Sequence, residues 1–435
     1  MLDIHQLRQG ETMNIFQEVE SGVQSYARSF PKIFNKAKGV HLYDVDGEKH
    51  LDFLAGAGTL NYGHNNPVLK EALLEYISQD GVAHGLDMHT DAKARFLTEF
   101  KERILVPRKL EYVVQFTGPT GANAVEAALK IARNVTGRHN VVAFTNGFHG
   151  VTLGSLAATG NSHHRDAAGV PLNSVTHLPY DGYLGKDVDT SKLLDKMITD
   201  NSSGLDLPAA VILETVQGEG GLNVASERWL RNVEAICRKH GILLIVDDIQ
   251  AGCGRTGTFF SFEKAGIKPD IVTLSKSLSG FGLPFAVTLI KPEHDQWKPG
   301  EHNGTFRGNN HAFITAAAAI RHYWSTPDFA GDIERKSEIL RTELSKIADK
   351  HGKTLMQVRG RGMMRGLNCR DGDLAAAICK RAFLKGLIIE TSGSESQVVK
   401  CLCPLVISEQ ELKEGLVILA QCVEDALADE ISKAS

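Results

Sequence analysis

Pro269-Asp-Ile-Val-Thr-Leu-Ser-Lys-Ser-Leu-Ser-Gly280 is a short apolar run that ends at a lysine, Lys276, and continues into small residues. The run is typical of a buried strand, and the small residues leave the lysine amine free to move. Upstream, the apolar run Ile242–Asp248 ends in two aspartates, and Phe116–Ala124 places glycines before a helix. An amine, a carboxylate and a glycine turn suit a cofactor with an aldehyde, a ring nitrogen and a phosphate, which is pyridoxal phosphate (PLP).

Strands and helices are expected to alternate between about residues 110 and 290. Strands rich in Val, Ile and Leu that are separated by helices indicate a mostly parallel sheet covered on both faces. In such α/β sheets, functional groups gather where strand ends give way to loops. The expected strands are Tyr112–Phe116, Asn140–Phe144, Ala209–Val216, Ile242–Asp247, Ile271–Leu274 and Ala286–Ile290, and the expected helices include Asn123–Val135 and Glu227–His240.

The composition is that of a soluble globular protein, with 42% hydrophobic residues, 23% charged residues and a net charge of -4. No basic block indicates a nucleic-acid or membrane partner, and no apolar run approaches the ~20 residues of a transmembrane helix. The N-terminal residues lack the apolar core of a signal peptide. The seven cysteines are scattered, and Cys401-Leu-Cys403 has no second cluster at metal-binding spacing. We therefore expect reduced thiols, a cytoplasmic location and no metal site.

Two further features fit the phosphate and the ring of PLP. Gly121 and Ala122 stand where a helix begins, so their amides can bind a phosphate, although a glycine there is often only an entry turn. Phe148, within Gly147-Phe-His-Gly150, follows an expected strand and could lie flat against the ring. A core aromatic residue is an equally good interpretation of Phe148 taken alone.

Asp247 and Asp248 end an apolar run, where a buried carboxylate is costly unless it is paired. A protonated pyridine nitrogen is a suitable partner, and the pairing would keep the ring able to accept electrons. A helix cap or a surface turn would explain one aspartate, but not a pair followed by Gln250. Lys276 would hold the cofactor aldehyde as a Schiff base and, once released, shuttle protons.

Gly252-Cys-Gly-Arg-Thr-Gly257 matches the glycine fingerprint of nicotinamide dinucleotide sites. That fingerprint must open a helix and have an acidic residue about 20 positions later. Here Thr258-Phe-Phe-Ser-Phe262 follows, which is not a helix start, and the aspartates precede the glycines. A nicotinamide oxidoreductase is therefore not expected.

The chain resembles the class III (ω-amino acid) aminotransferases, which are PLP enzymes of fold type I, from about residue 25 to near its end. The segments that carry the resemblance are Glu214–Gly221, Asp247–Gly257, Pro269–Lys276 and Gly304–Asn309. It implies an α/β fold in which a large domain surrounds a mostly parallel sheet and a smaller domain is α+β.

Three parts of the chain are expected on this basis. An N-terminal segment (1–65) would pack with the small domain, a large PLP-binding domain would cover 66–330, and the small C-terminal domain would cover 331–435. Strands of the small domain are expected at Val358–Leu367, Gly386–Glu390 and Val398–Leu402.

One branch of the family, the diaminobutyrate–2-oxoglutarate aminotransferases of ectoine biosynthesis, is similar in Gly56–Pro67, Phe116–Gly121 and Ser275–Pro284. The resemblance implies transfer of the amino group of L-glutamate to L-aspartate 4-semialdehyde, giving L-2,4-diaminobutyrate and 2-oxoglutarate. Alternatives are an ornithine, acetylornithine or 4-aminobutyrate aminotransferase, or the same reaction in siderophore synthesis. A catalytically silent PLP-fold binding protein is the alternative from another class, although the joint presence of Lys276, Asp247 and Thr305 argues against it.

The resemblance also assigns roles to individual residues. Thr305 of the partner subunit would bind the cofactor phosphate, so a homo-oligomer with sites at its interface is implied. The remaining cofactor contacts would be the amides of Gly121 and Ala122 on the phosphate, Phe148 on the ring, Asp247 on the ring nitrogen, Gln250 on the ring hydroxyl and Lys276 in the covalent bond.

Phosphate binding departs from the family pattern at two positions. Ala122 and Asn123 stand where the family usually has a hydroxyl residue and a glutamate. The phosphate would therefore depend on backbone amides and on Thr120.

The substrate-binding positions depart further. Lys400 stands where many members carry an arginine for the α-carboxylate of glutamate, and Glu219 matches the glutamate that pairs with that arginine. A lysine cannot make the planar two-pronged contact of an arginine. Either Lys400 binds the carboxylate as a point charge, or Arg165 or Arg307 does so. Asp87 could meet a second ammonium group, although a surface carboxylate is the more ordinary interpretation.

Overall fold

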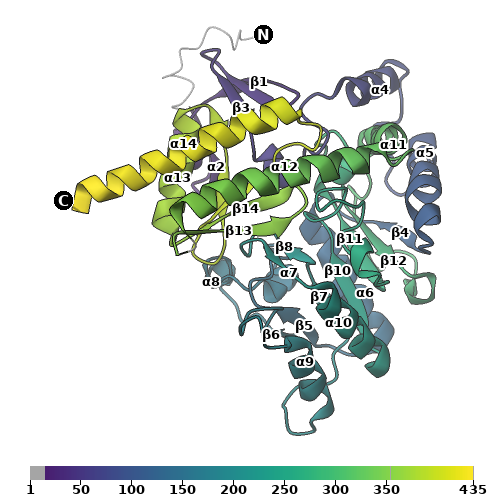
Figure 1. The fold of residues 1–435 in the computed structure, drawn as a ribbon. Helices are drawn as coiled ribbons and strands as arrows, with labels where there is room; N and C mark the ends of the chain where they lie inside the picture. The colour runs from purple at the N-terminus through teal and green to yellow at the C-terminus, as the bar shows by residue number, and fades with distance from the viewer. Residues whose placement is uncertain (1–14, 353, 435) are drawn as a thin grey trace.

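The computed structural model describes residues 15–352 and 354–434. Its centre is a seven-stranded sheet in the order β4-β12-β11-β10-β7-β5-β6 (Figure 1). Neighbouring strands are parallel except at β12, which runs antiparallel to β4 and β11. The predicted α/β fold with a mostly parallel sheet is confirmed. The strands are β4 (Val113–Phe116), β5 (Val141–Phe144), β6 (Val175–Leu178), β7 (Ala210–Leu213), β10 (Leu243–Asp247), β11 (Ile271–Leu274) and β12 (Val287–Ile290).

All six predicted strands of this sheet occur, and two details differ. The predicted strand 209–216 ends at Leu213. Val216 belongs to another strand, β8 (Val216–Gln217), which forms a separate two-stranded sheet with β9 (Asn223–Val224). β6 was not predicted. It is an edge strand in which three of four residues are only half-buried, so its sequence has no continuous apolar run.

The two predicted helices are α6 (Gly121–Thr136) and α10 (Glu227–His240). Each begins where a hydroxyl, on Thr120 or Ser226, accepts a hydrogen bond from an amide of the first helical turn. Each ends before a glycine with positive φ, Gly137 at 66° and Gly241 at 60°. The buried side of α6 packs on β11 and β12. Local capping signals thus fix the helix that begins at the expected phosphate site.

The C-terminal region forms a sheet in the order β13-β14-β17-β16, and one further strand of this region, β15, joins strands from the N-terminus. β15 pairs with β3, so a second sheet runs β1-β2-β3-β15. The predicted strand 358–367 is a hairpin of β13 and β14, and the predicted strand 386–390 splits into β15 and β16, which belong to different sheets. These strands are β1 (Phe34–Lys38), β2 (His41–Asp44), β3 (Lys49–Asp52), β13 (Met356–Arg361), β14 (Met364–Cys369), β15 (Leu387–Ile388), β16 (Glu390–Ser392) and β17 (Val398–Cys401).

Helices α12 and α14 contact each other, and α12 packs on β13 and β14 of the C-terminal sheet (Figure 1). Among the described residues, no helix is long and apolar enough to cross a membrane, and all seven cysteines are free thiols. The other helices are α2 (Tyr26–Ser29), α3 (Ala55–Gly58), α4 (Pro67–Ser78), α5 (Asp91–Phe100), α7 (Leu153–Ala158), α8 (Ser162–Arg165), α9 (Thr190–Thr199), α11 (Asn310–Tyr323), α12 (Asp328–His351), α13 (Gly372–Leu384) and α14 (Glu409–Ala434).

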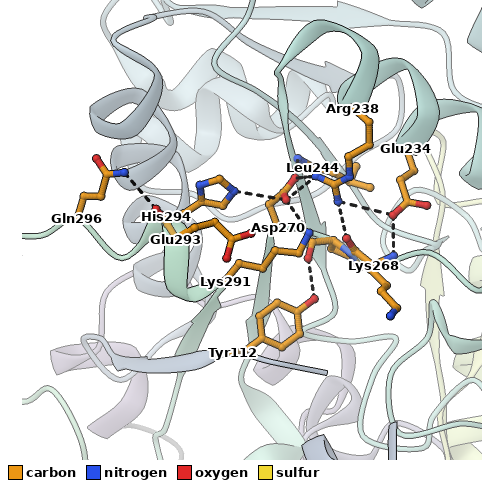
Figure 2. Close-up of polar contacts among 11 residues, drawn as sticks. Tyr112, Glu234, Arg238, Leu244, Lys268, Asp270, Lys291, Glu293, His294 and Gln296 are labelled. Atoms are coloured by element: carbon orange, nitrogen blue, oxygen red, sulfur yellow. Dashed lines mark hydrogen bonds and ion pairs between the residues drawn. The ribbon is translucent and has the colours of Figure 1, made fainter. Parts of the chain in front are cut away.

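A buried carboxylate, Asp270, anchors the start of β11, the strand that leads to Lys276. Figure 2 shows three basic side chains around it, Arg238, Lys291 and His294. Arg238 contacts both carboxylate oxygens at 2.5 and 2.7 Å, Lys291 lies at 2.9 Å and His294 at 3.5 Å. Burial alone would raise the pKa of Asp270, but these contacts hold that pKa well below its usual value. The carboxylate is therefore ionised in the folded protein.

We expect Asp270→Asn to lower the free energy of unfolding by about 2 kcal/mol at pH 7, because it replaces a buried carboxylate that accepts charge-assisted hydrogen bonds from Arg238 and Lys291 with a neutral amide. The pKa of Asp270 is lower in the folded than in the unfolded protein, so its contribution is complete above pH about 4 and is lost as the pH falls further. Thermal unfolding at pH 7 and below pH 4 should therefore show a difference that shrinks in acid. Exposed Asp206→Asn is the control, and a difference that grows in acid would contradict this account.

Candidate active site

The residues predicted to bind PLP meet at the carboxyl edge of the central sheet. Asp247 is the last residue of β10, and Lys276 follows β11. Both line a cavity of about 180 Å³, so the structure brings together every predicted cofactor residue except Thr305. The lining residues are Gly121, Ala122, Phe148, His149, Gly150, Glu214, Glu219, Asp247, Ile249, Gln250 and Lys276.

Lys276 opens a short 3-10 turn and has a positive φ of 50°. This conformation is uncommon for a residue with a side chain, and such strain clusters at functional sites. The Nζ atom donates a hydrogen bond to the carbonyl oxygen of Ala57 at 2.8 Å. Ala57 belongs to a turn of four consecutive residues with positive φ, Ala55–Gly58. Burial lowers the pKa of Lys276, although Glu219 opposes the shift. A lowered pKa leaves a larger fraction of the amine unprotonated near neutral pH, and only the unprotonated amine can attack an aldehyde or take a proton.

Asp247 is only 4% exposed, and both of its oxygens are held. One contacts Nδ1 of His149 at 2.8 Å, and the other accepts a hydrogen bond from the hydroxyl of Thr273 at 3.0 Å. Burial opposes a charge on His149, but the Asp247 carboxylate raises the pKa of His149 above its usual value. His149 was not predicted as a site residue, although the histidine after Phe148 was a signal available in the sequence.

Glu214 is a second site residue that the sequence prediction missed. Its carboxylate accepts hydrogen bonds from the amides of Phe148 at 2.9 Å and Gly218 at 3.1 Å. Burial raises the pKa of Glu214 to about 7, although His149 opposes the shift. Glu214 therefore joins the loop that carries Phe148 to the turn that carries Glu219. Its position directly after the apolar strand β7, like that of Asp247 in β10, was the available signal.

The expected phosphate site is the N-terminus of α6. Gly121 and Ala122 lie in the first helical turn, where N–H groups have no partner within the helix and the dipole favours an anion. The hydroxyl of Thr120 is engaged in the helix cap, where it contacts Oδ1 of Asn123 at 2.9 Å. A Cβ atom at Gly121 would come within 2.9 Å of the Ile249 side chain, so this approach favours glycine. A phosphate here would depend on the two amides.

Two other side chains complete the cavity. Phe148 is half-buried and borders the cavity rather than the core. Gln250 donates from Nε2 to the carbonyl of Ala57 and to Glu219, both at 3.0 Å, whereas its Oε1 atom is buried without a partner among the described residues. A buried acceptor without a donor is costly, so Gln250 fits a ligand that supplies a donor, such as a ring hydroxyl. Amine, carboxylate, helix N-terminus and free acceptor thus match the polar groups of PLP.

Lys400 is fully buried beside this cavity. Its Nζ atom lies 2.8 Å from Glu219 and 3.0 Å from Glu390. Burial alone would lower the pKa of Lys400, but the two carboxylates raise it above its usual value. Burial likewise opposes the charge on Glu219, yet Lys400 and Lys276 lower the pKa of Glu219 to about 2. Lys400 therefore meets Glu219 and also a second carboxylate that the sequence did not predict.

Besides Lys400, four predicted residues do not border the cavities next to Lys276. Arg165 donates to the carbonyls of residues 156, 157 and 159 near the end of α7. Arg307 forms an ion pair with Asp87. Thr305 is exposed on the loop before α11. Their proposed contacts with a substrate or with the site of a partner subunit stay predictions.

The family model described as aminotransferase class III matches residues 23–423. The chain belongs to the class III aminotransferases. It is therefore an enzyme that transfers amino groups, and its cofactor is PLP.

This aminotransferase is similar to curated relatives over nearly its whole length. The diaminobutyrate–2-oxoglutarate transaminase of Vibrio parahaemolyticus is 60% identical over 97% of this chain and 100% of the relative. The relatives of the same name from Vibrio cholerae and Halomonas elongata are 62% identical (94% of this chain, 98% of the relative) and 57% identical (95% and 99%).

Solved structures show the same fold at lower identity. An ornithine aminotransferase from Toxoplasma gondii has a TM-score of 0.85 and 24% identity, covering 97% of this chain and 95% of that structure. An S-selective transaminase from Arthrobacter has a TM-score of 0.86 and 21% identity, covering 98% and 99%. These neighbours confirm fold type I.

Proposed function

We propose that this aminotransferase moves the amino group of L-glutamate to L-aspartate 4-semialdehyde, giving L-2,4-diaminobutyrate and 2-oxoglutarate. The observation that carries the proposal is the 57–62% identity to three relatives named for this transamination. The ornithine aminotransferase structure, at 24% identity, supports only a shared fold. A place in ectoine biosynthesis and a cytoplasmic location, which the sequence favours, belong to the same proposal.

Lys276 is the residue to which we assign the proton transfers. Bound PLP supplies an electron sink for the negative charge that develops on the substrate carbon. The amine of Lys276 takes the Cα proton of glutamate in the first half-reaction, and its lowered pKa increases the fraction of free base near neutral pH. In the second half-reaction the same amine returns a proton to the terminal carbon of the semialdehyde.

The other cavity residues hold the cofactor for this chemistry. Asp247, fixed by His149 and Thr273, would keep the ring nitrogen protonated. Phe148 would restrict the ring to one plane, and the amides at the start of α6 would bind the phosphate. Each group is carried by a strand end or a helix start, so the site is preorganised by the fold.

A partner subunit is also part of the proposal. Thr305 is exposed and lies outside the cavities of its own chain, which is the placement expected of a residue that serves a neighbouring site. We therefore propose a homo-oligomer in which Thr305 binds the phosphate of the partner subunit. Thr305→Ala should therefore weaken PLP binding and leave the positions of the residues around Lys276 unchanged.

The substrate is tested by comparing the second half-reaction with three aldehydes that differ in chain length or in the α-ammonium group. Aspartate 4-semialdehyde should react with a kcat/KM at least about tenfold above those of glutamate semialdehyde and succinate semialdehyde, because a site built for one chain length and one ammonium group discriminates against the others. The rates are read from the absorption change of the enzyme-bound cofactor. Faster reaction with either competitor would assign the enzyme to ornithine or 4-aminobutyrate instead.

A further inference from the structure

A second cavity of about 1450 Å³ adjoins the cofactor cavity and shares Phe148, Glu219 and Lys276 with it. Its wall also includes Tyr26 and Glu390. Because this space borders the Lys276 amine, it is where the part of a substrate beyond its reacting carbon would lie.

The ammonium of Lys400 is hidden from this space behind two carboxylates. Lys400 is 0% exposed and does not line the cavity, whereas both of its partners, Glu219 and Glu390, do. With both carboxyl groups ionised, this group, hereafter the carboxylate pair with Lys400, has a net charge of -1. Burial raises the pKa of Glu390, although Lys400 opposes the shift. A substrate therefore meets carboxylate oxygens here rather than a cation.

The two carboxylates are held differently. Glu390 lies in β16 directly opposite Lys400 in β17, so the antiparallel register fixes the two side chains next to each other. Glu219 lies in the turn between β8 and β9. If a carboxylate of a substrate enters and displaces Glu219, Lys400 still has Glu390 as its counter-ion. The cation therefore stays neutralised, and its attraction for that carboxylate is reduced.

We propose that Glu390 is a specificity-determining residue: with Glu219 it makes the part of the substrate space beside Lys400 acidic and favours amino donors whose far end carries an ammonium group. The inference rests on the proposed function, since L-2,4-diaminobutyrate has such a group at Cα. Glutamate reacts at Cα, and its far end is the side-chain carboxylate, which carries no ammonium group. Arg28 and Lys380 line the same cavity and can take the carboxylate of an amino-acid end, whereas Lys32 is paired with Asp44 and Asp46.

A matched pair of donors isolates the charge. L-2,4-Diaminobutyrate and 4-aminobutyrate present the same reacting end and carboxylate, and differ only in the α-ammonium. In Glu390→Gln, the KM for diaminobutyrate should rise roughly tenfold or more, which is the order of effect of one nearby charge at an effective dielectric of about 20. The KM for 4-aminobutyrate should stay constant or fall, and kcat should change little for either donor. Half-reactions followed by cofactor absorption give both constants.

Three further variants support the test. Glu390→Asp keeps the charge and should retain the preference for diaminobutyrate, and Glu390→Met gives a second neutral side chain if Glu390→Gln does not fold. Glu395→Gln removes an exposed charge from the loop between β16 and β17 and should change neither constant. Equal changes for both donors, or none, would refute the role of Glu390. If the unchanged enzyme does not react with diaminobutyrate at all, the proposed function and this inference both fail.

Discussion

Turnover of Lys276→Ala should be at least about 10⁴-fold below that of the wild type, because the variant lacks the only lysine among the described residues that lines the cofactor cavity, and with it the base for both proton transfers. The loss should appear in kcat of each half-reaction. PLP should still bind through the α6 amides and Asp247, but its visible spectrum should change because the covalent bond is absent.

Lys192→Ala is the matched control, since Lys192 is exposed on α9, far along the chain from the strands that form the site. Its turnover and spectrum should equal those of the wild type. Wild-type spectrum and turnover in Lys276→Ala would show that another amine holds the cofactor.

Asp247→Asn is expected to lower turnover about 10²- to 10³-fold, because an amide cannot stabilise a protonated ring nitrogen. The same change removes the carboxylate that raises the pKa of His149, so the pKa of His149 should fall. Steady-state kcat measured with saturating PLP checks the prediction, since excess cofactor separates lost chemistry from weaker binding.

The neighbouring aspartate provides the control for this variant. Burial raises the pKa of Asp248 to about 7, so its side chain is partly protonated at neutral pH and an asparagine resembles it. Its Oδ2 accepts from the amide of Ser261 and does not border the cavity. Asp248→Asn should keep most of the activity. A larger loss in Asp248→Asn than in Asp247→Asn would reverse the assignment of the two residues.

The parts of the fold predicted from sequence are those with local signals. The apolar runs of β10 and β11 end at polar residues, so strand, edge and functional side chain could be located together. β6 lacks such a run because it lies at the edge of the sheet and is half-buried. The division of residues 386–390 between two sheets depends on partners far away, β3 and β17, which no local pattern reveals.

The site shows the same contrast. The cofactor residues could be listed because motif and chemistry agree at each position. His149 and Glu214 were missed because each acts through another residue. His149 contacts Asp247, and Glu214 binds the amide of Phe148, and these contacts exist only in the folded chain. Glu390 is visible only through the strand register that places it against Lys400.

The central claim is that PLP is bound covalently to Lys276 while its ring faces Asp247. Borohydride reduction of the holoenzyme, followed by proteolysis and mass spectrometry, tests it most directly. The account predicts that a single peptide gains the cofactor and that fragmentation places the adduct at residue 276. An adduct on any other lysine, or no adduct at all, would contradict it.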